Sequence, residues 1–299
     1  MKNEKVLIIG GAGFLGESIT TELIKLDYDV TIFDKNKPRL ITEGVQYIKG
    51  DILDVKKLNE AIANKDYVFL YSSIADISEA KSKYIETINT NIIGAANVFD
   101  ASSKAKVKRL IFASTMYVYS VYGSFYRASK QSSEILLETF SDEFDLKYTI
   151  LRFGSIYGPG AQDWNGMKRY ITEIFEKGSL TYWGSGEEKR DYIHIHDATM
   201  LTIKAMQDDA YVNRAVTITG QQVLSAMDLI NLLFEIIGVD KDYKFTGIDK
   251  EHGHYVISPY KYKPIRSIKL VPDKFIDIGQ GILEVVEEVA LEKEASDEK

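Results

Sequence analysis

The feature that most constrains the fold of this chain is a short apolar run that ends in three evenly spaced glycines. Residues 6–9 are Val-Leu-Ile-Ile, and Gly10, Gly13 and Gly16 come after them before a helical pattern of apolar residues begins. This order is typical of a buried parallel strand that turns sharply into a helix. We expect Gly10 to make the turn, Gly13 to let the backbone approach a pyrophosphate, and Gly16 to let the helix pack on the strand. The helix N-terminus would direct free N–H groups and a positive dipole end at the same phosphates.

A carboxylate ends the next predicted strand, residues 30–34. Asp34 comes after the glycine turn and one predicted helix, at the place where dinucleotide-binding domains set an acid against the adenosine ribose hydroxyls. An acid there repels a 2′-phosphate, so this residue favours NAD over NADP. NADP stays open as the alternative because Lys35, Lys37 and Arg39 come soon after the acid.

Strands and helices alternate with short connections through the first half of the chain. The strands predicted next are residues 45–49, 67–71 and 109–113, and the helices between them are residues 54–63 and 79–104. This pattern predicts an α/β fold built on a doubly wound parallel sheet. Ligands of such sheets bind outside the carboxyl ends of the strands. The segments at those ends are the glycine turn, Asp34, Ser72-Ser73 and Thr115.

Composition excludes several classes of function. The 299-residue chain has a net charge of −7, which argues against a nucleic-acid partner. It has no cysteine, which excludes disulfides, thiol catalysis and cysteine-based metal sites. We predict no metal, because no ordered set of carboxylates accompanies the histidine pairs of the sequence. No apolar stretch is long enough to span a bilayer or to form the core of a signal peptide, so we expect a cytoplasmic protein without a membrane partner.

A tyrosine and a lysine four residues apart open the helix predicted after Thr115. Tyr126 and Lys130 would lie on one face of this helix, residues 124–143. A nearby cation lowers the pKa of a phenol by favouring the phenolate, so Tyr126 could act as a base near neutral pH. The spacing alone is a weak signal, and its place after Thr115 gives it weight.

Taken together, these segments resemble the extended short-chain dehydrogenase/reductases. The matching motifs, in chain order, are the Gly-x-x-Gly-x-x-Gly turn, Asp34, Gly50-Asp51, Asn91-Ile-Ile-Gly-Ala-Ala-Asn-Val98, Thr115, Tyr126-x-x-x-Lys130, Leu151-Arg-Phe-Gly-Ser-Ile-Tyr-Gly-Pro159 and Arg190-Asp-Tyr-Ile-His-Ile-His-Asp197. The resemblance is firm over residues 5–205. It implies a Rossmann-type domain and oxidation or reduction at a sugar or polyol carbon with NAD as cofactor.

The resemblance also implies roles for the site residues. Tyr126 would deprotonate the substrate hydroxyl while hydride passes to the nicotinamide, and Thr115 would hydrogen-bond the same oxygen. Lys130 would bind the nicotinamide ribose and lower the pKa of Tyr126. Ser155 and Arg190 would lie at the substrate phosphates, whose geometry a guanidinium matches. The complete set of predicted NAD-binding residues is Gly10, Gly13, Phe14, Leu15, Gly16, Asp34, Asp51, Ile52, Ser72, Ser73, Asn91, Tyr126 and Lys130.

The two residues after Thr115 narrow the choice of reaction. Sugar-nucleotide 4,6-dehydratases of this family carry an Asp-Glu pair there, where this chain has Met116-Tyr117. The resemblance is nearest to the UDP-glucose 4-epimerases, so the first hypothesis is an NAD-dependent epimerase of a nucleotide sugar that acts through a transient ketone. The alternatives are an NAD(P)-dependent reductase or dehydrogenase of a sugar or related alcohol, and a non-catalytic dinucleotide-binding regulator. Only ten residues separate Thr115 from Tyr126, fewer than in close relatives, so we expect an open active-site mouth.

Two interleaved lobes are expected. Residues 1–154 would form the NAD-binding domain, and residues 188–218 would return to it. Residues 155–187 and 219–292 would form a smaller substrate-binding lobe, and residues 293–299 would form a charged tail.

The resemblance also predicts a homodimer. The helices predicted for residues 79–104 and 124–143 should pack side by side on one face of the sheet. In relatives, such a pair meets the same pair of a second subunit in a four-helix bundle, so the prediction rests on family analogy.

Overall fold

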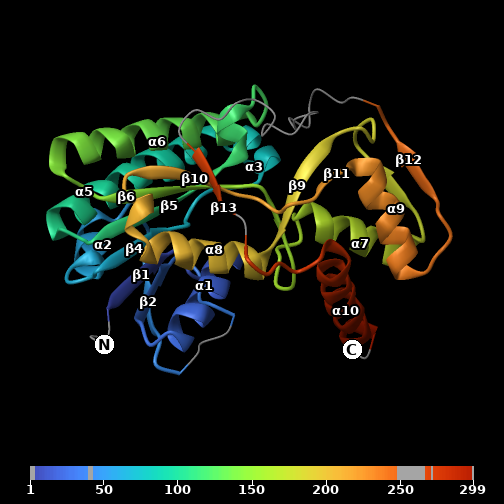
Figure 1. Cartoon of the computed structure of the whole chain (residues 1–299), viewed down its shortest axis with the longest axis horizontal. Coiled ribbons are helices and arrows are strands. Elements are labelled where there is room, and N and C mark those ends of the chain that lie inside the picture. Colours follow the sequence, from blue (N-terminus) through green and yellow to red (C-terminus); the bar gives the residue numbers. More distant parts are fainter. Residues whose placement is uncertain (1–3, 40–42, 248–266, 271, 298–299) are drawn as a thin grey trace.

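The computed structural model describes residues 4–39, 43–247, 267–270 and 272–297. Eight parallel strands form the sheet of the larger lobe (Figure 1): β1 (Lys5–Ile9), β2 (Asp29–Asp34), β3 (Gln46–Lys49), β4 (Tyr67–Leu70), β5 (Arg109–Thr115), β6 (Tyr148–Phe153), β10 (Arg214–Ile218) and β13 (Ser267–Leu270). Their order across the sheet is β13-β10-β6-β5-β4-β1-β2-β3. The strand order reverses at β1, whose neighbours are β2 and β4. A ligand crevice is expected at the carboxyl ends of strands at such a point.

Helices cover both faces of this sheet. One face carries α2 (Val55–Ile62), α5 (Ala95–Ala105) and α6 (Ser124–Phe144), and the other carries α1 (Phe14–Lys25) and α8 (Ile195–Gln207) (Figure 1). Side chains of β1 alternate between the two cores: Leu7 and Ile9 join the first, whereas Val6 and Ile8 join the second. This burial on both faces explains why the strand is continuously apolar. The predicted doubly wound α/β fold is confirmed, and α5 and α6 pack side by side as predicted.

The long helix predicted over residues 79–104 is divided into shorter pieces. They are α3 (Ile77–Ser82), α4 (Tyr84–Ile88), a π-helical turn (Asn89–Gly94) and α5. Lys83 interrupts the helix with φ −110° and ψ 48°. The Lys83 carbonyl accepts from the Thr87 amide at 2.8 Å and from the Thr87 hydroxyl at 3.0 Å, so α4 starts directly at the break. Apolar periodicity continues across the interruption, so the sequence pattern did not reveal it.

The smaller lobe has its own core and two small sheets. Its strands are β7 (Ser155–Tyr157), β8 (Leu180–Tyr182), β9 (Lys189–His194), β11 (Val223–Ser225) and β12 (Tyr243–Phe245). Its helices are α7 (Gly166–Lys177), α9 (Ala226–Ile237) and α10 (Ile278–Asp297). Strands β11, β9 and β7 form one sheet and β12 and β8 the other. The helices bury Ile171, Leu233 and Ile282 against one another.

Strand pairing bears on the expected division into lobes. Strand β9, within residues 188–218, pairs with β11 and β7 and not with a strand of the large sheet. Strand β13 pairs with β10 in the large sheet, although it lies within residues 219–292, which we assigned to the smaller lobe. Strand β13 is a four-residue edge strand without a distinctive motif, so its pairing with β10 could not be predicted from the sequence. The remaining limits of the lobes stay a proposal.

Helix α10 extends through most of the predicted charged tail. It runs from Ile278 to Asp297, and residues 291–296 are exposed. Of the helices in the described part of the chain, none is long and apolar enough to cross a membrane.

Candidate active site

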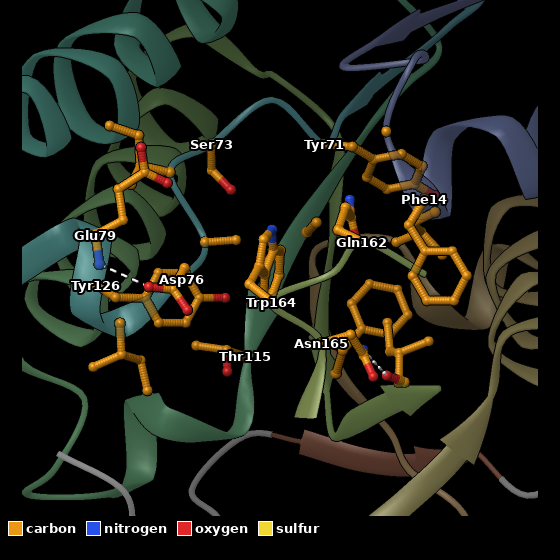
Figure 2. Close-up of a pocket in the computed structure, with 18 of the residues that line it drawn as sticks. Phe14, Tyr71, Ser73, Asp76, Glu79, Thr115, Tyr126, Gln162, Trp164 and Asn165 are labelled. Atoms are coloured by element: carbon orange, nitrogen blue, oxygen red, sulfur yellow. Dashed lines mark hydrogen bonds between the residues drawn. The ribbon is translucent and has the colours of Figure 1, made fainter. Parts of the chain in front are cut away.

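A pocket of about 830 Å³ lies where the carboxyl edge of the large sheet meets the smaller lobe. On the sheet side, its lining comes from the glycine turn, the segment after β4, the end of β5 and the first turns of α6. Residues 153–157 and parts of 162–170 and 182–192 line much of the remainder. The segments predicted to lie at the strand ends therefore meet in one cavity. In Figure 2, Asp76 and Tyr126 lie on one side of the pocket and Gln162 and Asn165 on the other.

Close backbone packing shapes the glycine turn. Gly10 has φ +85°, and a Cβ there would lie 2.4 Å from the Ser72 amide nitrogen. A Cβ on Gly16 would lie 2.4 Å from the Gly10 carbonyl oxygen, so the helix packs on the turn as expected. At Gly13 a Cβ would have just one neighbour within 4 Å, the Gly10 oxygen at 3.3 Å. Gly13 is also the N-cap of α1 and makes no side-chain cap, so this helix N-terminus faces the pocket through bare backbone.

Asp34 holds the turn from the neighbouring strand. Its carboxylate accepts hydrogen bonds from the Ala12 amide at 3.0 Å and from the Asn36 amide at 2.8 Å, and it lines the pocket. Two of the three cations that come after it are paired with acids. Lys35 lies 3.0 Å from Asp51, and Arg39 is paired with a glutamate of α1. These pairs lower the capacity of the segment to attract a 2′-phosphate, which favours the NAD alternative.

We predict that Asp34→Asn weakens NAD binding. The amide keeps one acceptor but loses the charge, and a hydrogen bond to a charged group contributes about 1.5–3 kcal/mol, so the NAD Kd should rise roughly 10- to 100-fold. Calorimetry with NAD and NADP measures the change, and discrimination against NADP should shrink. Asp29→Asn, at the opposite end of β2, is the matched control. Equal NAD affinity in both variants would contradict a ribose-binding role for Asp34.

Thr115, Tyr126 and Lys130 converge on the same wall of the pocket. Thr115 ends β5, and its hydroxyl oxygen accepts from the Tyr117 amide at 3.3 Å in the short 3₁₀ turn Met116–Tyr119. Tyr126 lies in the first turn of α6, and both Tyr126 and Thr115 line the pocket. Lys130, one turn later, is buried, and its ammonium donates to the Ala113 carbonyl at 2.8 Å. The ammonium nitrogen is 6.0 Å from the centre of the Tyr126 ring.

Burial controls how these groups ionise. Desolvation raises the pKa of Tyr126 to about 12, although the hydrogen bond with Thr115 lowers it in part. Desolvation also lowers the pKa of Lys130 to about 8, against the opposing effect of the nearby Glu134 carboxylate. Our expectation that Lys130 lowers the pKa of Tyr126 is therefore not met in the protein alone. The lysine charge is directed at a carbonyl, and the cost of removing a phenolate from water dominates.

Lys130→Met should reveal the lysine's titration in the stability of the protein. Burial depresses the pKa of Lys130 from 10.5 to about 8, so the charged form destabilises the native state below pH 8, and this cost disappears as the pH rises toward 10.5. The free energy of unfolding of the variant, relative to wild type, should therefore fall as the pH rises from 8 to 10. Urea unfolding at several pH values measures it. A difference that does not vary with pH would contradict the depressed pKa.

Asn91 supports the pocket without lining it. Its side chain binds both the amide and the carbonyl of Ile74, at 2.8 and 3.0 Å, and donates to Ser129 of α6 at 3.0 Å. It therefore joins the segment after β4 to the helix that carries Tyr126. It lies in the π-helical turn, a local distortion frequent at functional sites.

The structure brings together most of the predicted site residues. Those that line the pocket are Gly10, Gly13, Phe14, Leu15, Gly16, Asp34, Ser72, Ser73, Thr115, Tyr126, Lys130, Ser155 and Arg190. Asp51, Ile52 and Asn91 are not part of the lining. Asp51 pairs with Lys35, and Ile52 is buried beneath the π-helical turn, where a Cβ on Gly94 would lie 2.4 Å from its side chain. Their role in NAD binding stays a prediction.

Sequence reasoning missed much of the opposite wall. Gln162, Trp164, Asn165 and Arg169 line the pocket from the loop before α7 and from that helix. No motif marks them, and their position depends on how the smaller lobe packs. Asp76 could have been found, because it lies beyond a strand end and its side chain caps α3 by accepting from the Glu79 amide at 2.7 Å. The acids of this segment, Asp76 and Glu79, are also pocket residues.

The sheet, the glycine turn and the shared pocket of Thr115, Tyr126 and Lys130 define a dinucleotide-binding α/β protein of the short-chain dehydrogenase/reductase class. The chain belongs to the NAD dependent epimerase/dehydratase family, whose model matches residues 6–218. This confirms the resemblance found in the sequence.

Similar proteins cover most of the chain. It is 33% identical over 247 residues to a UDP-N-acetyl-alpha-D-glucosaminuronate decarboxylase of Bacillus cytotoxicus, covering 73% of this chain and 75% of the relative. It is 28% identical to a putative UDP-glucose 4-epimerase of Methanocaldococcus jannaschii, covering 94% and 97%. The crystal structure of the UDP-glucose 4-epimerase of Thermotoga maritima with UDP-glucose is similar with a TM-score of 0.83 and 25% identity, covering 97% of this chain and 99% of that one.

Proposed function

We propose that this protein is an NAD-dependent epimerase that acts on a nucleotide sugar through a transient keto intermediate. The observation that carries the proposal is that Thr115, Tyr126 and buried Lys130 line the same pocket as the glycine turn. This arrangement offers a hydroxyl pair for an alcohol within reach of a dinucleotide site. Similarity over nearly the whole chain to proteins named as UDP-glucose 4-epimerases supports the choice of reaction.

The pocket fits NAD at its glycine end. The open face of Gly13 and the uncapped start of α1 would bind the pyrophosphate, and Asp34 would bind the adenosine ribose. Ser72 and Ser73 line the path between this end and Tyr126. Bound NAD supplies a hydride acceptor that can return the hydride to the substrate.

Tyr126 exchanges the proton and Thr115 orients the reacting oxygen. Oxidation of the sugar hydroxyl transfers its proton to Tyr126, and reduction of the ketone returns it, so no acid or base is consumed. Because desolvation holds the pKa of Tyr126 near 12, the phenolate needs a positive charge in the pocket, and oxidised nicotinamide carries one. Lys130 holds its own position through the Ala113 carbonyl and would bind the nicotinamide ribose.

Charges in the pocket select the substrate class. Arg169 and Arg190 line it from the smaller lobe and would bind the diphosphate of a nucleotide sugar, with Ser155 beside them. Asp76 and Glu79 line it from the side of Tyr126 (Figure 2). Glu79 is paired with Lys83 at 2.9 Å, so Asp76 is the carboxylate that would repel a uronate. We therefore expect a neutral sugar and not the uronic acid named for the Bacillus cytotoxicus relative. Met116-Tyr117 offers no acid–base pair for dehydration.

Assay of the purified protein with NAD and neutral nucleotide sugars tests the proposal. Tyr126→Phe removes one oxygen and should lower kcat about 10²- to 10⁴-fold, the range of a proton-transfer catalyst. Binding of NAD should change less than threefold. NMR of the sugar product measures conversion, and Tyr122→Phe, an exposed neighbour, is the matched control.

Other outcomes identify the alternatives. Stoichiometric NADH formation from an alcohol would identify the reductase or dehydrogenase, in which the cofactor exchanges at each turnover. NAD binding with no turnover, unchanged by the Tyr126 substitution, would identify the non-catalytic regulator.

We also propose that the protein is a homodimer and that it acts in the cytoplasm. Large apolar side chains are exposed along α4, the π-helical turn and α6: Ile85 is 59% exposed, Ile93 50% and Ile135 64%. Tyr84 of α4 stacks on Phe125 of α6 with ring centres 5.3 Å apart. Exposed apolar surface on these helices supports their use as an interface.

Ile135→Lys should dissociate the dimer, because it places a charge in an apolar interface. Sedimentation velocity at micromolar concentration should show a dimer for wild type and a monomer for the variant. Leu291→Lys changes an exposed leucine of α10 and should leave the dimer intact. A monomeric wild-type protein would remove this prediction.

A further inference from the structure

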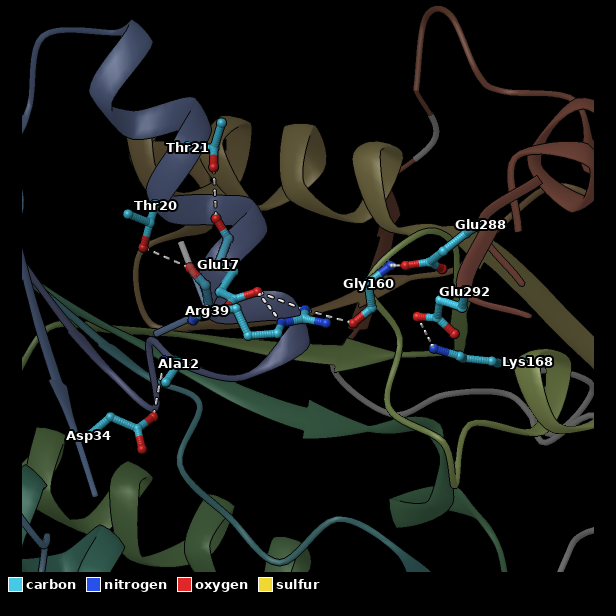
Figure 3. A network of polar contacts seen from close by, with 11 residues as sticks. Ala12, Glu17, Thr20, Thr21, Asp34, Arg39, Gly160, Lys168, Glu288 and Glu292 are labelled. Atoms are coloured by element: carbon cyan, nitrogen blue, oxygen red, sulfur yellow. Dashed lines mark hydrogen bonds and ion pairs between the residues drawn. The ribbon is translucent and has the colours of Figure 1, made fainter. Parts of the chain in front are cut away.

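We infer that Arg39 and Glu288 are positioning residues that clamp the pocket loop Gly160–Asn165 from opposite ends of the chain. Arg39 reaches the loop from the NAD-binding side of the molecule, and Glu288 reaches it from α10 (Figure 3). The role of this loop as a wall of the sugar site rests on the proposed function. The contacts of the clamp are independent of that function.

Both polar groups of Gly160 are bound by charged side chains. The Arg39 guanidinium donates to the Gly160 carbonyl, with Nη2 and the oxygen 2.9 Å apart. The Gly160 amide donates to Oε1 of Glu288 at 2.7 Å. Gly160 has φ +83°, and a Cβ there would lie 3.1 Å from Arg39 Nη2. A glycine is therefore suited both to the backbone conformation and to the approach of the arginine.

Glu17 fixes the orientation of Arg39. The Arg39 backbone amide donates to Glu17 Oε1 at 2.8 Å, and the guanidinium donates twice to Oε2, at 2.9 and 2.7 Å. Glu17 lies in the first turn of α1, the helix whose N-terminus faces the pocket. An unpaired carboxylate there would oppose an anionic ligand at the helix N-terminus, and Arg39 neutralises it. The arginine therefore links the helix of the glycine turn to the loop.

The Glu288 carboxylate occupies a position that is unfavourable for one of its two oxygens. Its second carboxylate oxygen is buried and has no hydrogen-bond partner among the described residues. Leaving a buried charged acceptor unpaired is unfavourable. The positive charge of Arg39 offsets part of this cost, since the Glu288 carboxylate is among the groups that raise the pKa of Arg39. The hydrogen bond to the Gly160 amide is thus what the position of Glu288 provides.

Three residues of the clamped loop line the pocket. Gln162, Trp164 and Asn165 line the pocket within five residues of Gly160. Asn165 fixes the far end of the loop, because its side chain donates to the Ile156 carbonyl at 2.9 Å and accepts from the Met167 amide at 3.1 Å as the cap of α7. Between these two anchors, Trp164 is 47% exposed. Its position therefore depends on how firmly Gly160 is held.

If Arg39 only stabilised the fold, its loss would lower the melting temperature. If it positions the loop, its loss should change the loop alone. The Arg39 side chain is 58% exposed, and ion pairs with so much solvent contact contribute little to global stability. Loss of the clamp should therefore loosen the loop while the melting temperature hardly changes.

Tryptophan fluorescence tests the clamp without any substrate. The chain has two tryptophans, so Trp183→Phe leaves Trp164 as the reporter. In this background, Arg39→Met should at least double the acrylamide quenching constant of Trp164. Arg39→Lys, which keeps a donor, should restore part of the protection. Lys37→Met removes an exposed cation two residues away and is the matched control.

Two substitutions of Glu288 distinguish the effect of its hydrogen bond to Gly160 from the effect of its charge. Glu288→Gln keeps an acceptor for the Gly160 amide and should stay close to wild type, whereas Glu288→Ala should increase quenching as Arg39→Met does. The proposal would be overturned if the quenching constant of Trp164 in Arg39→Met and in Glu288→Ala were the same as in the control Lys37→Met.

Kinetics then test whether the loop belongs to the sugar site. With a turned-over nucleotide sugar, Glu288→Ala, which leaves the Arg39–Glu17 pair intact, should raise KM about tenfold and change the NAD Kd less than twofold. Increased quenching with unchanged KM would keep the clamp and remove the loop from the sugar site. If no sugar is turned over, the proposed function fails, and the quenching result still decides on the clamp.

Discussion

The structure depends first on the close contact between Gly10 and the peptide after β4. The turn after β1 and the segment at Ser72 are so near that a single added carbon on Gly10 would lie 2.4 Å from a backbone nitrogen. This contact sets the start of α1 beside the crevice between the carboxyl ends of β1 and β4. The dinucleotide end of the pocket and the hydroxyl pair on β5 and α6 consequently share one cavity.

Desolvation of Tyr126 and Lys130 determines how both groups ionise in the pocket. Desolvation disfavours both the Tyr126 phenolate and the Lys130 ammonium, so each group is shifted toward its neutral form. Desolvated surroundings strengthen charge interactions, and a bound cation can therefore change the ionisation of the phenol strongly. In this account, the reaction begins only once the cofactor is in place.

Local features of the fold and site could be predicted from the sequence, and long-range ones could not. The glycine turn, Asp34 and the Tyr126/Lys130 pair carry their geometry in their spacing, and all line one pocket. The edge position of β13, the break at Lys83 and the Arg39–Gly160–Glu288 contacts depend on residues far apart in the chain. The direction of the Tyr126 pKa shift was missed because spacing reveals a neighbouring cation and says nothing about desolvation.

The most direct measurement of the central claim is a crystal structure of the protein with both NAD and UDP-glucose. The account predicts the nicotinamide carbon that carries hydride and a sugar carbon roughly 3–3.5 Å apart, with Tyr126 and Thr115 hydrogen-bonded to the hydroxyl on that sugar carbon. Arg190 would lie at the diphosphate. A structure in which NAD binds elsewhere, or in which the Tyr126 hydroxyl points away from both ligands, would contradict it.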